Sequence, residues 1–387
     1  MEFIDLDIQQ KRIRDKLEAN IQNVLNHGRY IMGPEVKKLE DALAGYVGMN
    51  HAIGCASGTD AILLALMAYN VGPGDAIFTT PFTFISTAEV ISLLGATPVF
   101  VDIDPNTFNL DPDSLEKAVM ALKTNDTLLS PLPETPASTP LKPRGVISVD
   151  LFGLPADYQS LKSIVEKHDL FLIQDAAQSF GAEYKGRRAC SQGDIGCTSF
   201  FPAKPLGCYG DGGMCFTDDD NLAYTIQSLR IHGKGSNKYD NVRIGINGRL
   251  DTIQAAILLA KFEIFAEEIE LRQGVAEKYS MLLSGINDRL KTPTVPEDCR
   301  SAWAQYSVLA EDELNRTSLQ EKLKRENIPT AIYYPKPLHL QPVFNCLCYK
   351  KGDFPVSEKC ASMILSLPMH PYLREGDQRR IAEIVKS

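Results

Sequence analysis

Apolar residues near the start of the chain recur with a helical period. Five of them, spaced three or four positions apart, would share one face of an amphipathic helix over residues 8–26: Ile13, Leu17, Ile21, Val24 and Leu25. A second helix is predicted over residues 34–47, where Pro34 stands near the first turn.

Between about residues 52 and 220, short apolar runs alternate with helical stretches. The apolar runs predict six strands: Ala76–Thr79, Thr97–Asp102, Gly145–Val149, Phe171–Gln174, Cys197–Phe201 and Gly213–Phe216. Helices are predicted over 58–69, 83–94, 112–122 and 157–168. Strands that are apolar on both faces and separated by helices indicate a mostly parallel sheet in an α/β protein. In such sheets ligands collect at the carboxyl ends of the strands.

The second half of the chain has a different organisation. Residues 124–144 hold five prolines and predict a surface loop, either a tolerated insertion or a functional lid. A long helix is predicted over residues 251–283, followed by a smaller α/β lobe with a strand at Thr330–Tyr333. We therefore expect a large domain over residues 1–260, and a linking helix with a small domain over 261–387.

Composition and charge exclude several functions. Hydrophobic residues make up 44% of the 387 residues and charged residues 23%, which is typical of a globular protein. The net charge of −9 argues against a nucleic-acid-binding surface. No apolar run approaches the roughly 20 residues of a membrane span, and the N-terminus lacks a signal-peptide pattern, so a cytoplasmic protein is expected. The nine cysteines match no zinc-binding spacing and predict free, mostly buried thiols.

Lys204 is the first candidate for chemistry. It lies between an apolar strand and a glycine-rich run that allows close approach to a ligand. Burial there would lower its pKa and free the amine as a nucleophile. A lone lysine is more often a surface residue, so the prediction depends on its neighbours.

Two further segments suit a phosphorylated ring. Asp175 directly follows the strand ending at Gln174, where a carboxylate could hold the protonated nitrogen of a pyridine ring; the alternative is a helix N-cap. Gly58 and Thr59 open a predicted helix, whose free N–H groups suit a phosphate, and Ser199 could add a hydroxyl. A simple N-cap is again the alternative.

Two other segments add weaker signals. Phe84 follows a strand end, where an aromatic ring can stack on a planar ligand, although alone it would more often be core. Asn247 and Arg249 lie among glycines and suit contacts to phosphate or carboxylate. A solvated loop is the alternative for that segment.

Taken together, these segments resemble the DegT/DnrJ/EryC1/StrS family of sugar aminotransferases. The motifs that carry the resemblance are Ser-Gly-Thr-Asp-Ala, Thr-Phe, Asp-Ala-Ala-Gln-Ser, Ser-Phe-Phe-Pro-x-Lys-x-Leu-Gly and Gly-x-Asn-x-Arg-x-Asp, and the similarity extends from about residue 3 to residue 380. The resemblance implies fold type I of the pyridoxal 5'-phosphate enzymes. That fold has a large domain with a seven-stranded, mainly parallel sheet, and it forms a homodimer with shared active sites.

The resemblance also implies a role for each matching residue. Lys204 matches the Schiff-base lysine and Asp175 the partner of the ring nitrogen. Gln178 matches the residue beside the ring hydroxyl, and Phe84 matches the ring that stacks on the cofactor. The phosphate cradle is matched by Gly58, Thr59 and Ser199. Asn247 matches an asparagine that reaches the phosphate from the neighbouring subunit. The positions that would face the substrate are Arg249, Tyr333 and Tyr334.

Within the family, the chain is most similar to members that act on UDP-2-acetamido-2-deoxy-3-oxo-glucuronate in O-antigen synthesis. This implies transamination from L-glutamate to that nucleotide sugar, with Lys204 moving the proton; a 4-keto or a dTDP-linked 3-keto hexose is the alternative acceptor. Two departures stand out: the proline-rich insertion, and Tyr333 where this subgroup often has His.

Two rival activities are less consistent with these residues. Pyridoxamine-dependent dehydratases of the family typically carry His at the position of Lys204. A regulator that binds the cofactor without turnover usually carries a separate DNA-binding module, for which no segment is left over.

Overall fold

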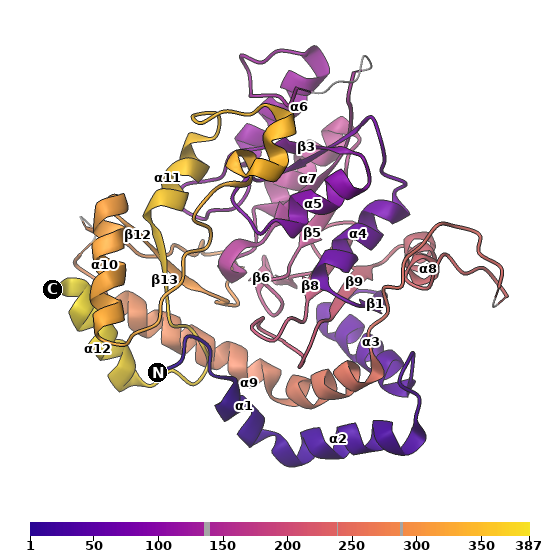
Figure 1. The fold of residues 1–387 in the computed structure, drawn as a ribbon, viewed down its shortest axis with the longest axis horizontal. Coiled ribbons are helices and arrows are strands. Elements are labelled where there is room, and N and C mark those ends of the chain that lie inside the picture. Colours follow the sequence, from indigo (N-terminus) through magenta and orange to yellow (C-terminus); the bar gives the residue numbers. More distant parts are fainter. Residues whose placement is uncertain (135–139, 238, 287–288) are drawn as a thin grey trace.

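The computed structural model describes residues 1–134, 140–237, 239–286 and 289–387. Its centre is a seven-stranded sheet in the order β1-β9-β8-β5-β4-β2-β3, and all of its strands except β9 run parallel (Figure 1). The strands are β1 His51–Cys55, β2 Asp75–Thr79, β3 Thr97–Phe100, β4 Lys142–Val149, β5 Phe171–Asp175, β8 Ile195–Ser199 and β9 Gly213–Thr217. The mainly parallel α/β sheet predicted from the sequence is confirmed.

Helices cover both faces of this sheet. The helices of the large lobe are α3 Pro34–Val47, α4 Gly58–Ala68, α5 Ser86–Leu93, α6 Pro112–Thr124, α7 Tyr158–His168 and α8 Asp220–Leu229. Side chains of each strand alternate between the faces, so that Leu172 packs with α6 and α7 while Ile173 packs with α4 and α8. This alternation buries both faces and gives the nearly continuous apolar runs seen in the sequence.

The first two helices and the longest one lie along one side of the large lobe. Helix α1 spans Leu6–Arg12, α2 spans Arg14–His27 and α9 spans Thr252–Leu282, and Figure 1 shows α9 extending from beneath the sheet to the C-terminal lobe. The predicted single helix over 8–26 is interrupted at Ile13, which lies between α1 and α2. Leu25, expected on the apolar face, is 48% exposed.

The C-terminal lobe contains a three-stranded sheet in the order β10-β12-β13. Its elements, with the short 3-10 helices, are β10 Leu290–Lys291, β12 Tyr306–Ala310, α10 Glu313–Arg325, η2 Leu338–Leu340, η3 Pro342–Leu347, α11 Pro355–Met363, β13 Ile364–Leu367 and α12 Glu375–Lys386. A third small sheet joins β11 Cys299–Arg300 to β6 Glu183–Tyr184 and β7 Arg187–Arg188. The predicted domain boundary at 260/261 falls inside α9, and it stays a prediction.

Three expectations about elements need correction. The sequence reading missed β1, whose His51 and Gly54 interrupt an apolar run. The strand predicted at Thr330–Tyr333 is reduced to a single bridge between Ala331 and Ser366. The strand predicted to reach Phe201 ends at Ser199, because the chain turns there into the loop that carries Lys204.

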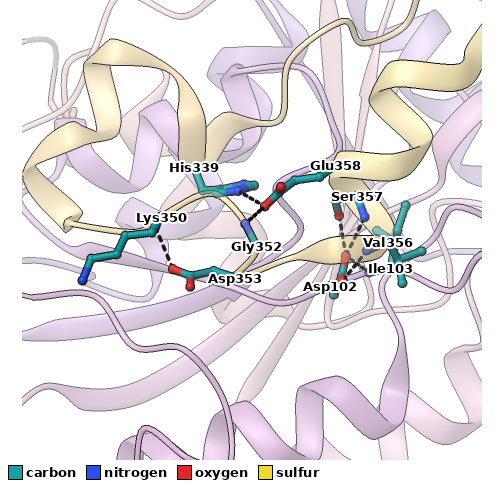
Figure 2. A network of polar contacts seen from close by, with 9 residues as sticks. All are labelled: Asp102, Ile103, His339, Lys350, Gly352, Asp353, Val356, Ser357 and Glu358. Carbon is teal, nitrogen blue, oxygen red and sulfur yellow. Dashed lines mark hydrogen bonds and ion pairs between the residues drawn. The ribbon is translucent and has the colours of Figure 1, made fainter. Parts of the chain in front are cut away.

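A polar network ties the C-terminal lobe to the edge of the large sheet. Asp102, just past β3, accepts hydrogen bonds from the N–H groups of Val356 and Ser357, both at 2.9 Å, and from the Ser357 hydroxyl at 2.6 Å (Figure 2). Nearby, the imidazole of His339 lies 3.0 Å from the carboxylate of Glu358. The contacts of Asp102 satisfy free N–H groups of the first turn of α11 and hold that helix against the end of β3.

The remaining expectations concern the surface and the thiols. The described part of the proline-rich insertion contacts η3, where the Glu134 N–H donates to the Leu347 carbonyl, and residues 135–139 lie outside the described residues. All nine cysteines are free and six are buried, which confirms that prediction. In the described parts of the chain, no helix is long and apolar enough to cross a bilayer.

Candidate active site

A cavity of about 440 Å³ opens at the carboxyl ends of the parallel strands. Strand ends converge here because β1, β4, β5 and β8 run in the same direction, and β9, which runs the opposite way, begins at this edge. Nine of the residues predicted for the site line the cavity: Gly58, Thr59, Phe84, Asp175, Gln178, Ser199, Lys204, Tyr333 and Tyr334. The sheet topology therefore brings together residues that are far apart in the sequence, from Gly58 to Tyr334.

Lys204 is carried by a tight loop between β8 and β9. The Lys204 N–H donates to the Phe201 carbonyl at 2.8 Å, and the Cys208 N–H returns to the Phe200 carbonyl at 2.8 Å. Burial lowers the pKa of the Lys204 ammonium, and the nearby carboxylate of Asp175 opposes that shift. The amine is thus more easily deprotonated than a surface lysine, as a nucleophile or a base requires.

Asp175 lies at the end of β5 and is 4% exposed. Its carboxylate accepts hydrogen bonds from the Thr87 hydroxyl at 2.9 Å and from the Ala177 N–H at 3.2 Å. Burial raises its pKa, while the bonds from Thr87 and Ala177 and the charge of Lys204 lower it. A buried carboxylate of this kind favours a positively charged partner in the cavity.

The start of α4 forms a closely packed cradle. Ser57 caps the helix by accepting from the Asp60 N–H at 3.0 Å, while the N–H groups of Gly58 and Thr59 belong to the unpaired first turn. A Cβ at Gly58 would lie 2.6 Å from the Cβ of Ser199, so only glycine lets these two segments meet. Backbone donors beside a hydroxyl at a helix start are the groups that a phosphate needs.

Of the other predicted residues, the aromatic ones line the cavity and two polar ones do not. Phe84 is 53% exposed, and its ring centroid lies 6.3 Å from that of Tyr334. Burial raises the pKa of the Tyr334 hydroxyl. Asn247 and Arg249 are not among the residues that line the cavity of their own chain.

Gln178 lines the cavity, but its amide is already engaged within the chain. Its side-chain oxygen accepts from the Phe152 N–H at 2.7 Å, and its nitrogen donates to the Tyr334 hydroxyl at 3.2 Å. A contact to a ring hydroxyl, as predicted from the resemblance, would share the Tyr334 bond or replace it.

Three further residues contribute to the site although the sequence motifs do not predict them. Thr87 supports Asp175, Gln305 lines the cavity from the C-terminal lobe, and Ile4 lines it from the N-terminus. The N-terminal segment is held there by a bond from the Met369 N–H to the Phe3 carbonyl at 3.2 Å. None of the three lies in the motifs from which the site is predicted.

The residues present fit pyridoxal 5'-phosphate. A buried amine, a buried carboxylate that prefers a cationic partner, and a cradle of free N–H groups line one cavity. Together with the seven-stranded sheet they define a pyridoxal-phosphate enzyme of fold type I.

Comparison with known proteins places the chain more narrowly. Residues 11–386 match the model of the DegT/DnrJ/EryC1/StrS aminotransferase family, and the chain belongs to that family. It is 49% identical over 373 residues to the UDP-2-acetamido-2-deoxy-3-oxo-D-glucuronate aminotransferase of Pseudomonas aeruginosa, covering 96% of each chain.

Two solved structures are similar over the whole chain. A DegT/DnrJ/EryC1/StrS aminotransferase from Brucella abortus is 48% identical with a TM-score of 0.93, covering 100% of this chain and 98% of that one. NtdA from Bacillus subtilis, with bound cofactor PMP, is 26% identical with a TM-score of 0.87, covering 100% and 85%. The protein is therefore a pyridoxal-phosphate-dependent aminotransferase.

Proposed function

We propose that this enzyme transfers the amino group of L-glutamate to the 3-keto group of UDP-2-acetamido-2-deoxy-3-oxo-glucuronate, for surface polysaccharide synthesis. The observation that carries the proposal is the placement of Lys204 and Asp175 in one buried cavity at the strand ends. The similarity to the Pseudomonas aeruginosa enzyme supports the choice of acceptor.

In this proposal the cofactor is held at three points. The N–H groups of Gly58 and Thr59 and the hydroxyl of Ser199 bind the phosphate. The carboxylate of Asp175 keeps the ring nitrogen protonated, and Phe84 covers the ring. When bound, the cofactor supplies a positively charged ring that accepts the electron pair left when the carbon–hydrogen bond beside the nitrogen breaks.

Lys204 moves the proton. Its neutral amine would take the proton from the α-carbon of glutamate and give it to the C4′ carbon of the cofactor. In the second half of the cycle it returns a proton to the carbon of the sugar that receives nitrogen. Burial favours this role because it lowers the pKa of the amine toward neutral pH.

We further propose that the active enzyme is a homodimer in which Asn247 and Arg249 complete the partner's site. Asn247 forms a bridge with Ile231, and Arg249 forms one with Cys55, next to the cradle. The side-chain Nε of Arg249 is buried without a hydrogen-bond partner in the described residues. Its guanidinium is our candidate for binding a carboxylate of glutamate or of the uronic acid in turn.

Absorbance spectroscopy tests the proposed function. The wild type with pyridoxal 5'-phosphate should show a long-wavelength band that bleaches with L-glutamate and returns when the keto sugar is added. Lys204→Ala should bind the cofactor without this cycle. A wild type that takes no amino group from glutamate, or that prefers a 4-keto or dTDP-linked sugar in a substrate panel, would contradict the proposal.

Mixing two inactive variants tests the shared site. If Asn247 serves the neighbouring subunit, Lys204→Ala and Asn247→Ala should regain activity when their subunits exchange, because one site of each mixed dimer is then intact. No recovery, with mixed dimers shown by mass spectrometry, would overturn that arrangement.

A further inference from the structure

Gln305 lines the candidate active site and also a smaller pocket beside Phe152 and Trp303, and its side-chain amide has no hydrogen-bond partner among the described residues. Gln305 lies one residue before β12. Its backbone N–H donates to the Phe152 carbonyl at 3.4 Å, and this hydrogen bond joins the C-terminal lobe to the large lobe. Its side-chain oxygen is buried without a hydrogen-bond partner, and its side-chain nitrogen has none among the described residues.

The neighbouring amide makes a useful contrast. Gln178 uses both ends of its side chain, one on the Phe152 N–H and one on the Tyr334 hydroxyl. Gln305 lines the same cavity, yet neither end is used. A buried amide oxygen without a donor weakens the fold, and a ligand that supplies the donor removes this cost.

The chemistry of the amide selects the kind of group that it binds. Either orientation of the side chain offers one acceptor and one donor. A carboxylate can accept from the amide N–H but has no proton for the amide oxygen, and the only donors of glutamate are on the amino group, which goes to the cofactor. A sugar, in contrast, carries hydroxyl groups and an acetamido N–H that can donate and accept.

We propose that the carboxamide of Gln305 binds a hydroxyl or acetamido group of the acceptor sugar and so determines specificity in the sugar half of the reaction only. This inference rests on the proposed function. It places a specificity residue in the C-terminal lobe, which also contributes Tyr333 and Tyr334 to the cavity, while the cofactor contacts come from the large lobe.

Gln305→Leu tests the proposal, since it keeps the approximate size and removes both polar atoms. The rate of bleaching by glutamate should stay at the wild-type value. The kcat/KM for the keto sugar should fall about tenfold, mainly through KM, as expected for one lost hydrogen bond. Gln305→Glu, which keeps an acceptor but loses the donor, should also weaken the sugar step and spare the glutamate step.

Gln273 provides a matched control in the same part of the structure. Its amide is fully used, since it donates to the Ser301 carbonyl and accepts from the Trp303 indole N–H at 2.9 Å. Gln273→Leu should lower the melting temperature and leave both half-reactions unchanged. Gln305→Leu should keep or raise the melting temperature of the free enzyme, because it removes an unpaired buried oxygen.

The outcomes separate this inference from the proposed function. The inference is overturned if Gln305→Leu leaves the sugar step unchanged, slows both half-reactions equally, or lowers the melting temperature as much as Gln273→Leu. A wild type that fails to accept the amino group of glutamate overturns the proposed function instead, whatever result the Gln305 variants give.

Discussion

Thr87→Val removes one hydrogen bond from the carboxylate at the centre of the site. The Thr87 hydroxyl donates to Asp175 at 2.9 Å, and both residues are buried, with Thr87 0% and Asp175 4% exposed. Valine has nearly the same shape, so the change removes the donor and leaves little empty space. A bond to a charged group contributes about 1.5–3 kcal/mol, and we expect the free energy of unfolding of the free enzyme to fall by about that amount where Asp175 is ionised.

The loss should depend on pH in one direction. Burial already raises the pKa of Asp175, and the Thr87 bond opposes that rise. Without Thr87 the pKa rises further, so the carboxyl protonates at a higher pH and then no longer needs the donor. The destabilisation should therefore be greatest at pH 8 and shrink as the pH falls, and the acid limb of cofactor binding should move to higher pH.

Urea denaturation of the free enzyme at pH 8 and at pH 5 measures this difference. Thr87→Ser, which keeps the hydroxyl and loses only a methyl group, is the control and should cost about 1 kcal/mol or less at both values. The reasoning is refuted if Thr87→Val destabilises equally at the two pH values, or if Thr87→Ser destabilises as much as Thr87→Val.

Three further changes test other parts of the structure. Gly58→Ala should weaken cofactor binding at least about tenfold, measured by titration, because its Cβ would meet Ser199. Gly45→Ala is the control: its Cβ would enter open space, so the free energy of unfolding should stay the same or rise by about 0.5–1 kcal/mol. Lys261→Met should raise the free energy of unfolding by about 2–3 kcal/mol at pH 7, because burial lowers the pKa of Lys261 from 10.5 to about 8. The gain should vanish above pH 10.5, where the lysine is neutral in both the folded and the unfolded chain. Urea denaturation that gives the same gain at pH 7 and above pH 10.5 would contradict this. Asp102→Ala should lower the free energy of unfolding by about 1–2 kcal/mol through the lost cap of α11, and an unchanged urea midpoint would show that this contact contributes nothing.

The local pattern of the sequence determined most of the large lobe. Strands such as β5 have apolar side chains on both faces, so their burial follows from composition alone. The bounds of α9, predicted as 251–283 and found as Thr252–Leu282, follow from an uninterrupted run without proline. Lys204, Asp175 and the cradle at Gly58 were found because each motif is local and follows a strand end.

Tertiary structure alone decided which other groups reach the cavity. Ile4 comes from the N-terminus, Thr87 from a helix and Gln305 from the C-terminal lobe. No regular spacing in the sequence links these residues to one another or to the motifs of the site. Asn247 and Arg249 belong to a local motif and do not line their own chain's cavity; for Asn247 the resemblance implies a place in the neighbouring subunit's site, and both assignments stay predictions. A sequence pattern records the faces that a segment buries, because burial depends on local periodicity. Which unpaired groups end up facing a ligand depends on contacts between distant segments, and only the folded chain determines those.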